Sequence, residues 1–417
     1  MAKRRQNADK SVRATWQMAY NSFSMTVTVR SFAKINLGLY IGAARADGYH
    51  TLRTVYQTIA LHDLIRVRVG RGRGIEIACN DPRVPLDASN TCYRMAERVL
   101  EALGAKARVS IEIEKRLPVQ GGLGAASSNA VATMMALERA MAGTGPFGSA
   151  QGRLRPVTTR KRKLSAEARL RIAAEVGSDL PLFLVGGTVL GVGRGEEVYP
   201  LPDLPSMAMV VVTPEVGVST PQAFADWDAL VQGEKAAELR SAGTGEGARP
   251  HTNSGAELCS AGQVRAPAPT RTRTGGDARR STNREQLTAG GASDRLVEVG
   301  CALPAWLSVY PNTGASAKGG SRAESLLSGL VRTGIENDFE RVVIPQYPEL
   351  RDIKGALERA GASYASLSGS GSALYGLFRS AGEAAKAASR LRKQGVRAEA
   401  TRTLTRQKYW KSLVVGR

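Results

Sequence analysis

A glycine-rich run at residues 118–132 restricts the fold of this chain more than any other stretch. It reads P-V-Q-G-G-L-G-A-A-S-S-N-A-V-A and contains Gly121, Gly122 and Gly124. The alternating run before it, 109–114, predicts a β-strand, and the alanine-rich run after it predicts a helix. Glycines allow positive φ, and free backbone N–H groups at a helix start attract anions. The pattern therefore predicts either a phosphate-binding loop or a glycine turn that merely begins a helix.

Two widespread nucleotide-binding patterns are absent from the sequence. No G-x-x-x-x-G-K-[ST] occurs, which excludes a P-loop NTPase. The glycine run does not read G-x-G-x-x-G, which excludes a Rossmann fingerprint at this position. Ser127 and Ser128 follow the glycines and supply hydroxyl groups that can contact phosphate oxygens or a bound Mg²⁺ ion.

The chain is strongly basic, but its charge is unevenly distributed. The formal net charge is +21 over 417 residues. The excess lies in residues 1–24, 143–165, 228–330 and 379–417, and the remaining segments together are neutral. A nucleic-acid-binding protein gathers basic residues on one folded face, often with aromatic residues, which are only 5% here. We therefore expect the charge to be peripheral surface decoration and do not expect nucleic acid as the main partner.

Cysteine usage and hydropathy favour a cytoplasmic protein. No uncharged apolar run reaches the roughly 20 residues of a membrane span, so no membrane partner is expected. The basic N-terminus is not followed by an apolar signal segment. The cysteines form no C-x-x-C pair and no zinc-type spacing with histidine, as expected for inert thiols in a reducing compartment. They are Cys79, Cys92, Cys259 and Cys301.

Composition and periodicity predict two α+β domains. The first, residues 25–205, follows a basic, disordered leader at 1–24 and contains a basic loop insertion at 143–164. The second, residues 206–417, is interrupted at 228–330 by a low-complexity insertion rich in Gly, Ala, Ser, Thr and Arg. Because this insertion lacks a period that could bury one face, we expect it to be mostly disordered.

Secondary-structure signals complete this outline. Without the insertion, the second domain reads β-α-β-β-α-β, which is the order of a ferredoxin-like unit. The sequence allows translation to start at Met1 or at Met25, just before the first strand. Strands are predicted at 26–41, 109–114, 207–213, 363–368, 373–378 and 396–404, and helices at 91–103, 125–140, 165–176, 349–361 and 380–394.

The glycine run resembles the P-x-x-x-G-L-G-S-S signature of the GHMP small-molecule kinases. This resemblance implies a two-domain α+β fold, with an N-terminal ATP-binding domain like ribosomal protein S5 and a C-terminal ferredoxin-like domain. The pair A-K-I-N-L and D-G-Y-H resembles the branch whose acceptor is a cytidine diphosphate sugar alcohol. The matching stretches are A-K-I-N-L-G-L at 33–39, A-D-G-Y-H-T-L at 46–52, G-S-D-L-P-L-F-L at 177–184 and S-G-S-G at 368–371, with weaker echoes at 89–91 and 336–340.

The resemblance implies a catalytic pair, Lys34 and Asp179. Asp179 would be the base for the attacking hydroxyl, and Lys34 would stabilise developing charge beside it. From the residues alone, Asp179 is equally an N-cap or a buried structural carboxylate, because it lies where a helix can begin. From the residues alone, a lysine in such a strand usually points to solvent, and this is the alternative for Lys34.

The resemblance also implies contacts with the acceptor. Asn36 lies on the same strand face as Lys34 by the period of two. Tyr49 and His50 follow an Asp-Gly turn and would contact the cytidine, although a surface loop explains them equally well. Thr220 lies in V-S-T-P, where the family has a further acceptor contact, but this is also a common turn sequence.

Nucleotide binding is implied for the loop and for two flanking positions. Asn90 is equally a good N-cap, and Lys115 is equally a solvated charge. Ala125 and Ala126 replace two glycines that the family usually has, and we expect a better helix start and less flexibility without loss of activity. The turn Ser368, Gly369, Ser370 and Gly371 would close over the loop, or is simply a tight β-turn. The implied ATP-binding set is Asn90, Lys115, Pro118, Gly121, Gly122, Leu123, Gly124, Ala125, Ala126, Ser127 and Ser128.

Together, these features predict a kinase that uses ATP and Mg²⁺ to phosphorylate the 2-hydroxyl of a cytidine diphosphate sugar alcohol in isoprenoid precursor synthesis. No metal site made of protein ligands alone is expected, and no oligomeric state follows from the sequence. The alternatives are another GHMP kinase, of the homoserine or mevalonate type, or a basic nucleic-acid-binding protein that has lost catalysis.

Overall fold

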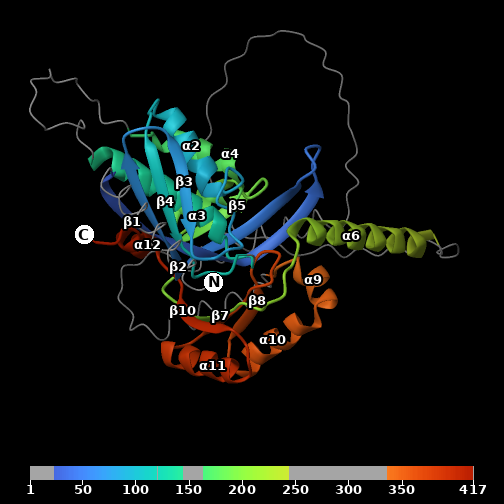
Figure 1. The fold of residues 1–417 in the computed structure, drawn as a ribbon. Coiled ribbons are helices and arrows are strands. Elements are labelled where there is room, and N and C mark those ends of the chain that lie inside the picture. The colour runs from blue at the N-terminus through green and yellow to red at the C-terminus, as the bar shows by residue number, and fades with distance from the viewer. Residues whose placement is uncertain (1–22, 120, 144–162, 244–335, 417) are drawn as a thin grey trace, which may run out of the picture.

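The computed structural model describes residues 23–119, 121–143, 163–243 and 336–416. These residues form the predicted α+β fold with two sheets, one in each domain (Figure 1). The N-terminal sheet is six-stranded, with the order β3-β4-β2-β5-β6 and with β1 paired to β2. The C-terminal sheet is four-stranded, with the order β10-β7-β9-β8.

A long antiparallel hairpin forms the base of the N-terminal domain. β1 (Phe23–Ala44) and β2 (His50–Gly70) pair along their length, and the Asp47-Gly48 turn joins them. The register shifts on both sides of the segment that carries Lys34 and Asn36. Such bulges redirect side chains next to sites. The remaining strands are β3 (Gly74–Cys79), β4 (Arg108–Glu114), β5 (Thr188–Val192) and β6 (Glu197–Pro200).

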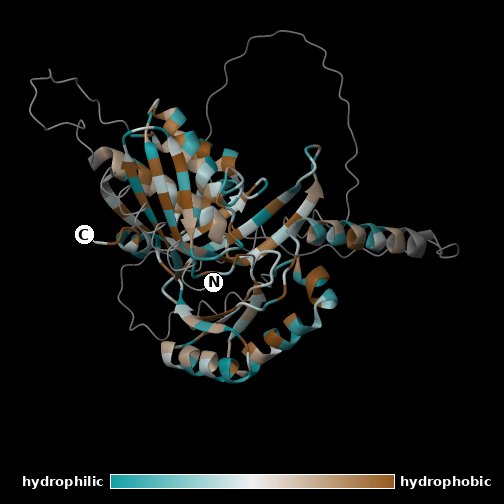
Figure 2. Cartoon of the chain, in the orientation of Figure 1, coloured by the Kyte–Doolittle hydropathy of each residue, from teal (hydrophilic) through white to brown (hydrophobic). Residues whose placement is uncertain are grey.

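Helices cover one face of this sheet. Polar and apolar residues alternate along its strands (Figure 2), so that one face packs on the helices. The core between them contains large side chains such as Met95, Ile111, Leu137 and Phe183, all almost fully buried. The helices are α2 (Thr91–Ala102), α3 (Ala125–Gly143), α4 (Ala166–Val176) and α5 (Leu180–Val185).

The C-terminal domain confirms the predicted β-α-β-β-α-β order. All three strand pairs in its sheet are antiparallel, as in ferredoxin-like folds. In the described part of the interval between its first strand and its first core helix lie α6 (Thr220–Gly243) and α9 (Glu340–Gln346). The core elements are β7 (Ala208–Val212), α10 (Pro348–Arg359), β8 (Tyr364–Leu367), β9 (Leu374–Phe378), α11 (Ala381–Lys393) and β10 (Ala398–Arg402).

The predicted start of the low-complexity insertion at residue 228 is wrong. Residues 228–243 continue α6 rather than forming a disordered segment. The reason is a short apolar stripe: Trp227 is buried in the C-terminal core, and Leu230 and Val231, three and four residues later, pack against it. Residues 244–330 of the predicted insertion lie outside the described residues, as do residues 1–22 of the leader and 144–162 of the basic loop.

The end of the chain returns to the N-terminal domain, against the prediction that all of 206–417 belongs to the second domain. α12 (Arg406–Ser412) lies beside β1 (Figure 1), where Arg30 donates to the Ser412 carbonyl, and its Tyr409 side chain contacts α5. The Tyr409 hydroxyl donates to the Phe183 carbonyl at 2.7 Å. Among the described residues, no helix has the length and apolarity to cross a membrane.

Candidate active site

Two adjoining cavities lie where the domains meet. The smaller, about 470 Å³, is lined by the glycine loop from Pro118 to Ser127, by residues 217–221 and by Gly371. The larger, about 690 Å³, contains the predicted catalytic and acceptor-binding residues. Gly122, Gly124, Ser127, Thr220 and Pro221 line both cavities. A molecule in one cavity therefore reaches the other across the start of α3.

The glycine loop is held by the turn of the second domain. The Ser368 hydroxyl donates to the Gly122 carbonyl at 3.0 Å. The Ala373 amide donates to the Gly121 carbonyl at 3.2 Å. A Cβ at Gly122, where φ is +71°, would lie 1.8 Å from the Ser368 carbonyl oxygen. This position therefore accepts only glycine, and the predicted contact between turn and loop is present.

The start of α3 explains the two alanines. The helix begins at Ala125, directly after the last glycine of the loop. Alanine favours helical backbone, which agrees with a helix that begins at these two residues. Ser127 lines both cavities. Ser128 does not: it is 2% exposed, and its hydroxyl accepts from the Ser31 hydroxyl at 2.7 Å.

Asp179 is not a helix cap in the usual sense. It occupies the N-cap position of α5, but its side chain makes no capping hydrogen bond. Instead Oδ1 accepts from the Tyr56 hydroxyl at 3.0 Å, and Oδ2 lies 3.7 Å from Lys34 Nζ. The side chain is 36% exposed and lines the larger cavity. A carboxylate held at one oxygen and open at the other suits a base.

Lys34 is a buried cation and not a solvent-facing lysine. Its residue exposure is 3%, and Nζ donates to Asn36 Oδ1 at 2.6 Å. Asn36 Nδ2 in turn donates to Thr54 Oγ1 at 2.7 Å. Burial lowers the pKa of Lys34, and the charge of Asp179 partly opposes this shift. Lys34 therefore lies beside Asp179, as the resemblance implies, and it also contacts Asn36 on the same strand face.

Aromatic side chains form the far end of the larger cavity. The His50 ring stacks on Phe224 of α6, with centroids 5.0 Å apart and planes 11° from parallel. His50 Nε2 lies 2.8 Å from Asp228 Oδ1. Tyr49 is 52% exposed, and the Arg194 guanidinium lies over its ring at 5.0 Å. Flat rings with a hydrogen-bonding edge suit a planar base.

Thr220 joins this cavity to the second domain. It begins α6, and its hydroxyl lies 2.7 Å from the Ser370 hydroxyl. Asn337 supports the same turn, because Nδ2 donates to the carbonyls of Leu367 and Gly369 at 2.9 and 2.8 Å. Thr220, Gly369 and Ser370 all line the larger cavity.

Asn90 and Lys115 line neither cavity. Asn90 caps α2, with Oδ1 accepting from the Cys92 amide at 2.8 Å. Lys115 Nζ is buried against Asp63 Oδ2 at 2.7 Å. Their nucleotide contacts stay a prediction, and the contacts described here are structural.

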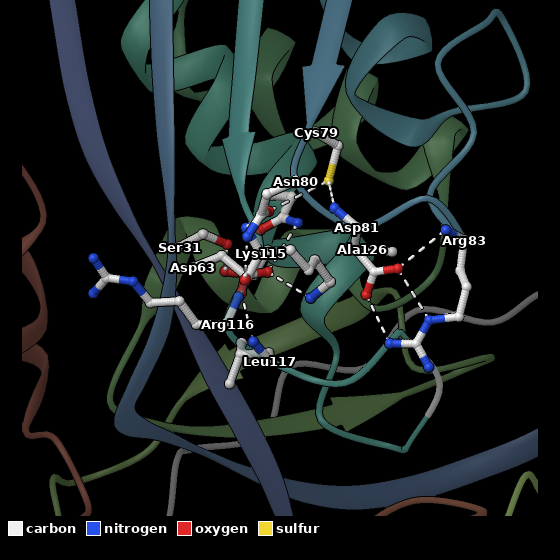
Figure 3. Close-up of polar contacts among 12 residues, drawn as sticks. Ser31, Asp63, Cys79, Asn80, Asp81, Arg83, Lys115, Arg116, Leu117 and Ala126 are labelled. Carbon is white, nitrogen blue, oxygen red and sulfur yellow. Dashed lines mark hydrogen bonds and ion pairs between the residues drawn. The ribbon is translucent and has the colours of Figure 1, made fainter. Parts of the chain in front are cut away.

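Asp63 is an organising residue that the sequence did not reveal. Its side chain is fully buried and lies against Lys115, Arg116 and Leu117, which lead into the glycine loop (Figure 3). Oδ1 accepts from the backbone amides of Arg116 and Leu117, each at 2.7 Å. Oδ2 accepts from Lys115 and, at 3.1 Å, from Asn129.

Four cavity residues were also missed. Tyr56 lies in a strand and Arg194 in a turn, where neither has a distinctive spacing. Phe224 and Asp228 lie on α6, a helix that the sequence patterns did not predict.

Two family models match this chain. The model described as GHMP kinases N terminal domain matches residues 90–187, and the one described as GHMP kinases C terminal matches residues 323–397. The first range holds the glycine loop and Asp179, and the second holds the closing turn. Fold and site therefore define a GHMP kinase, a phosphotransferase that takes phosphate from ATP.

Curated relatives identify the family within the GHMP kinases to which this chain belongs. The 4-diphosphocytidyl-2-C-methyl-D-erythritol kinase of Solibacter usitatus is 33% identical over 351 residues, which is 84% of this chain and 81% of that protein. The enzyme of the same name from Moorella thermoacetica is 30% identical over 379 residues, covering 91% of this chain and 99% of that protein. The chain belongs to the family of 4-diphosphocytidyl-2-C-methyl-D-erythritol kinases.

Solved structures agree on the fold. A 4-(cytidine 5'-diphospho)-2C-methyl-D-erythritol kinase matches with a TM-score of 0.55 and 24% identity, over 90% of this chain and 98% of that one. A homoserine kinase from Cytophaga hutchinsonii also reaches a TM-score of 0.55, at 18% identity, over 92% of this chain and 95% of that one. Because the two scores are equal, the fold does not distinguish the acceptors. Side chains in the cavity must do so.

Proposed function

We propose that this protein transfers the γ-phosphoryl group of ATP to the 2-hydroxyl of 4-diphosphocytidyl-2-C-methyl-D-erythritol, a step of the non-mevalonate isoprenoid precursor pathway. The products are ADP and the 2-phosphate. The observation that carries this proposal is the Lys34–Asp179 pair in the larger cavity, beside the glycine loop that both cavities share.

The glycine loop would hold the phosphates of ATP. Backbone N–H groups at the start of α3 and the helix dipole favour anions there. Among the described residues, no cluster of three or more His, Cys, Asp or Glu side chains could hold a metal ion. Mg²⁺ commonly keeps only one or two protein ligands and takes phosphate oxygens as well, so Ser127, which lines both cavities, would suit it beside ATP. When bound, the ion would neutralise charge on the phosphates.

Asp179 would accept the proton of the attacking hydroxyl on Oδ2. The Tyr56 hydroxyl fixes the other carboxylate oxygen. The Lys34 ammonium stabilises the alkoxide character that develops on the acceptor oxygen. Because phosphoryl transfer has a loose transition state, this positioning and charge stabilisation supply most of the catalysis.

The size and lining of the larger cavity favour a cytidylyl acceptor over homoserine or mevalonate. Its volume of about 690 Å³ falls within the range of sites for ligands of drug size. His50 and Phe224 offer a stacked, hydrogen-bonding end that a small aliphatic acceptor would leave unused. A cytoplasmic location is part of this proposal, and the free thiols Cys79 and Cys92 suit a reducing compartment.

Acceptor-dependent release of ADP tests the proposal. The purified full-length chain should release ADP with the cytidylyl alcohol, and at most slowly with homoserine or mevalonate. Asp179→Asn should lower kcat by about 10²-fold with little change in KM, because it removes the base and keeps the shape. A folded Asp179→Asn variant with near-normal turnover would remove Asp179 from the mechanism. Faster turnover of homoserine or mevalonate would favour the alternative GHMP activity.

A further inference from the structure

The proposed acceptor carries a diphosphate between its base and its polyol. That diphosphate is negatively charged and needs a cation or several donors inside the protein. Two residues with lysine or arginine side chains, Lys34 and Arg194, are among those that line the larger cavity. Lys34 is already engaged with Asn36 and Asp179. Arg194 is therefore the cationic lining residue that could bind the diphosphate.

The backbone at Arg194 lies beside the reacting end of the cavity. Arg194 is in the turn between β5 and β6, in G-V-G-R-G-E. A Cβ at the next residue, Gly195, would lie 2.6 Å from the Tyr56 hydroxyl and 3.8 Å from Asp179 Oδ1. Because φ is +103° there and the Tyr56 hydroxyl is so close, glycine is required. The turn is thereby held against the proposed base.

The guanidinium of Arg194 lies toward the end of the larger cavity that is opposite to Asp179. Its Cζ is 5.0 Å from the centroid of the Tyr49 ring, next to His50 and the proposed base-binding end. The residue therefore extends from the polyol end of the cavity to the base end. In the proposed acceptor, the group that connects these two ends is the diphosphate.

The guanidinium also keeps donors available. Nε donates to Glu196 Oε1 at 3.1 Å, and the Arg194 amide donates to Oε2 at 2.6 Å. Within the part of the chain that the structure describes, no acceptor engages Nη1 or Nη2. The side chain is 32% exposed, and hydrogen bonding to Glu196 raises its pKa, so the group stays charged. Two free donor groups on a fixed, planar cation match phosphate oxygens.

We propose that Arg194 binds the diphosphate of the acceptor and thereby selects diphosphate-bearing alcohols over small acceptors such as homoserine. This proposal rests on the proposed function, because it names the group of that acceptor that the cavity recognises. It assigns Arg194 to binding and specificity and leaves the chemical step with Lys34 and Asp179.

Calorimetric titration of CDP and cytidine into the full chain tests this role, with saturating ADP present to occupy the glycine loop. Arg194→Gln should weaken CDP binding by roughly 10- to 100-fold, the cost of losing charged hydrogen bonds. Cytidine, which lacks the diphosphate, should bind Arg194→Gln and the unchanged protein equally. The KM for the cytidylyl acceptor should rise with the loss of CDP affinity, and the KM for ATP should not change.

Arg45→Gln is the matched control. Arg45 is 39% exposed, pairs with Asp47 in the hairpin beside Tyr49 and lines neither cavity. Arg45→Gln should leave the affinities for CDP and for cytidine unchanged. Equal losses of CDP and cytidine affinity in Arg194→Gln would overturn the proposal, because Arg194 would then act by holding Tyr49. Unchanged CDP affinity in a variant that melts at the normal temperature would also overturn it.

Failure of the proposed function is a separate outcome. If the unchanged protein binds neither CDP nor cytidine and phosphorylates only homoserine or mevalonate, both proposals fail. If it phosphorylates the cytidylyl acceptor and Arg194→Gln does so with the same KM, only the assignment of Arg194 fails.

Discussion

The protonation of the buried Lys34 side chain is subject to two opposing effects. Desolvation favours the neutral amine, whereas Asp179 favours the ammonium form. Burial is the larger effect, so the pKa lies below the ordinary lysine value of 10.5. The pKa of Tyr56, which is buried beside the same carboxylate, shifts in the opposite direction. Burial, and then the charge of Asp179, raise it well above 10.0.

These shifts predict the alkaline limb of the pH–rate profile. The charged form of Lys34 stabilises the transition state, so kcat should fall as pH rises through a pKa below 10.5. Tyr56 should not contribute, since it ionises at higher pH. Arg stays protonated throughout, so the residual kcat of Lys34→Arg should be flat in this range. If the kcat of Lys34→Arg falls at alkaline pH as that of the unchanged protein does, the fall is caused by a group other than Lys34.

Asp63 stabilises the glycine loop through an entirely buried carboxylate. Replacing it by Asn places an amide group among donors and leaves the Lys115 ammonium buried without its partner. We expect Asp63→Asn to lower the free energy of unfolding by about 3 kcal/mol, the usual cost of breaking a buried pair. Chemical denaturation measures this.

Asp81→Asn serves as the control for Asp63→Asn. Asp81 lies in the same view and pairs with the exposed Arg83 at 2.7 Å (Figure 3). Asp81→Asn should lower the free energy of unfolding by much less than Asp63→Asn, because Arg83, the partner of Asp81, is 68% exposed. Equal effects of the two substitutions would show that burial of Asp63 is not what stabilises the loop.

At the scale of elements, α6 contributes most to the acceptor cavity. Thr220, Phe224 and Asp228 are spaced four residues apart, so they lie along one helix face. All three line the larger cavity. The apolar side chains of the same helix, Trp227, Leu230 and Val231, pack on the core of the second domain instead. One helix thus connects the core to the site.

Asp228 should matter more than its neighbour Asp226. Asp228→Ala removes the partner of His50 Nε2 and should raise the KM for the cytidylyl acceptor roughly 3- to 10-fold, the cost of one hydrogen bond. The KM for ATP should not change. The Asp226 carboxylate accepts hydrogen bonds from Gln222 and Gln346 and does not line the cavity. Asp226→Ala should therefore leave the KM values for the cytidylyl acceptor and for ATP unchanged. The reverse order of effects would contradict the assigned helix face.

Elements with regular periods were predicted well, and contacts across the fold were not. Strand alternation and the glycine loop were readable because they are local. Lys34 and Asp179 entered as a catalytic pair only through the family resemblance, and the structure brings them together beside the glycine loop. The helix α6 was missed because its apolar stripe is short and leads into a low-complexity stretch. Asp63 has no local signal, since its four donors lie 52 to 66 residues away in sequence.

At the scale of the whole molecule, the two domains are joined at the site itself. The closing turn of the second domain contacts the glycine loop of the first, and the chain end returns to the first domain as α12. The basic C-terminal segment is therefore not only surface decoration, as its charge suggested. Arg406 donates to the carbonyls of Gly186, Thr188 and Leu201.

Tyr409→Ala tests this return. Tyr409 is 2% exposed and packs on Phe32, so its removal leaves a cavity in the first domain. We expect a loss of about 3–5 kcal/mol in unfolding free energy. Trp410→Ala, next in sequence but 37% exposed, should cost clearly less. Similar losses for both would mean that α12 contributes through its surface rather than through burial.

The most direct test of the central claim is ³¹P NMR of the reaction product. With ATP and the cytidylyl alcohol, the account predicts ADP and a new phosphomonoester on the 2-oxygen, with the acceptor's diphosphate intact. Release of ADP without that phosphomonoester, or phosphate on another oxygen, would contradict it.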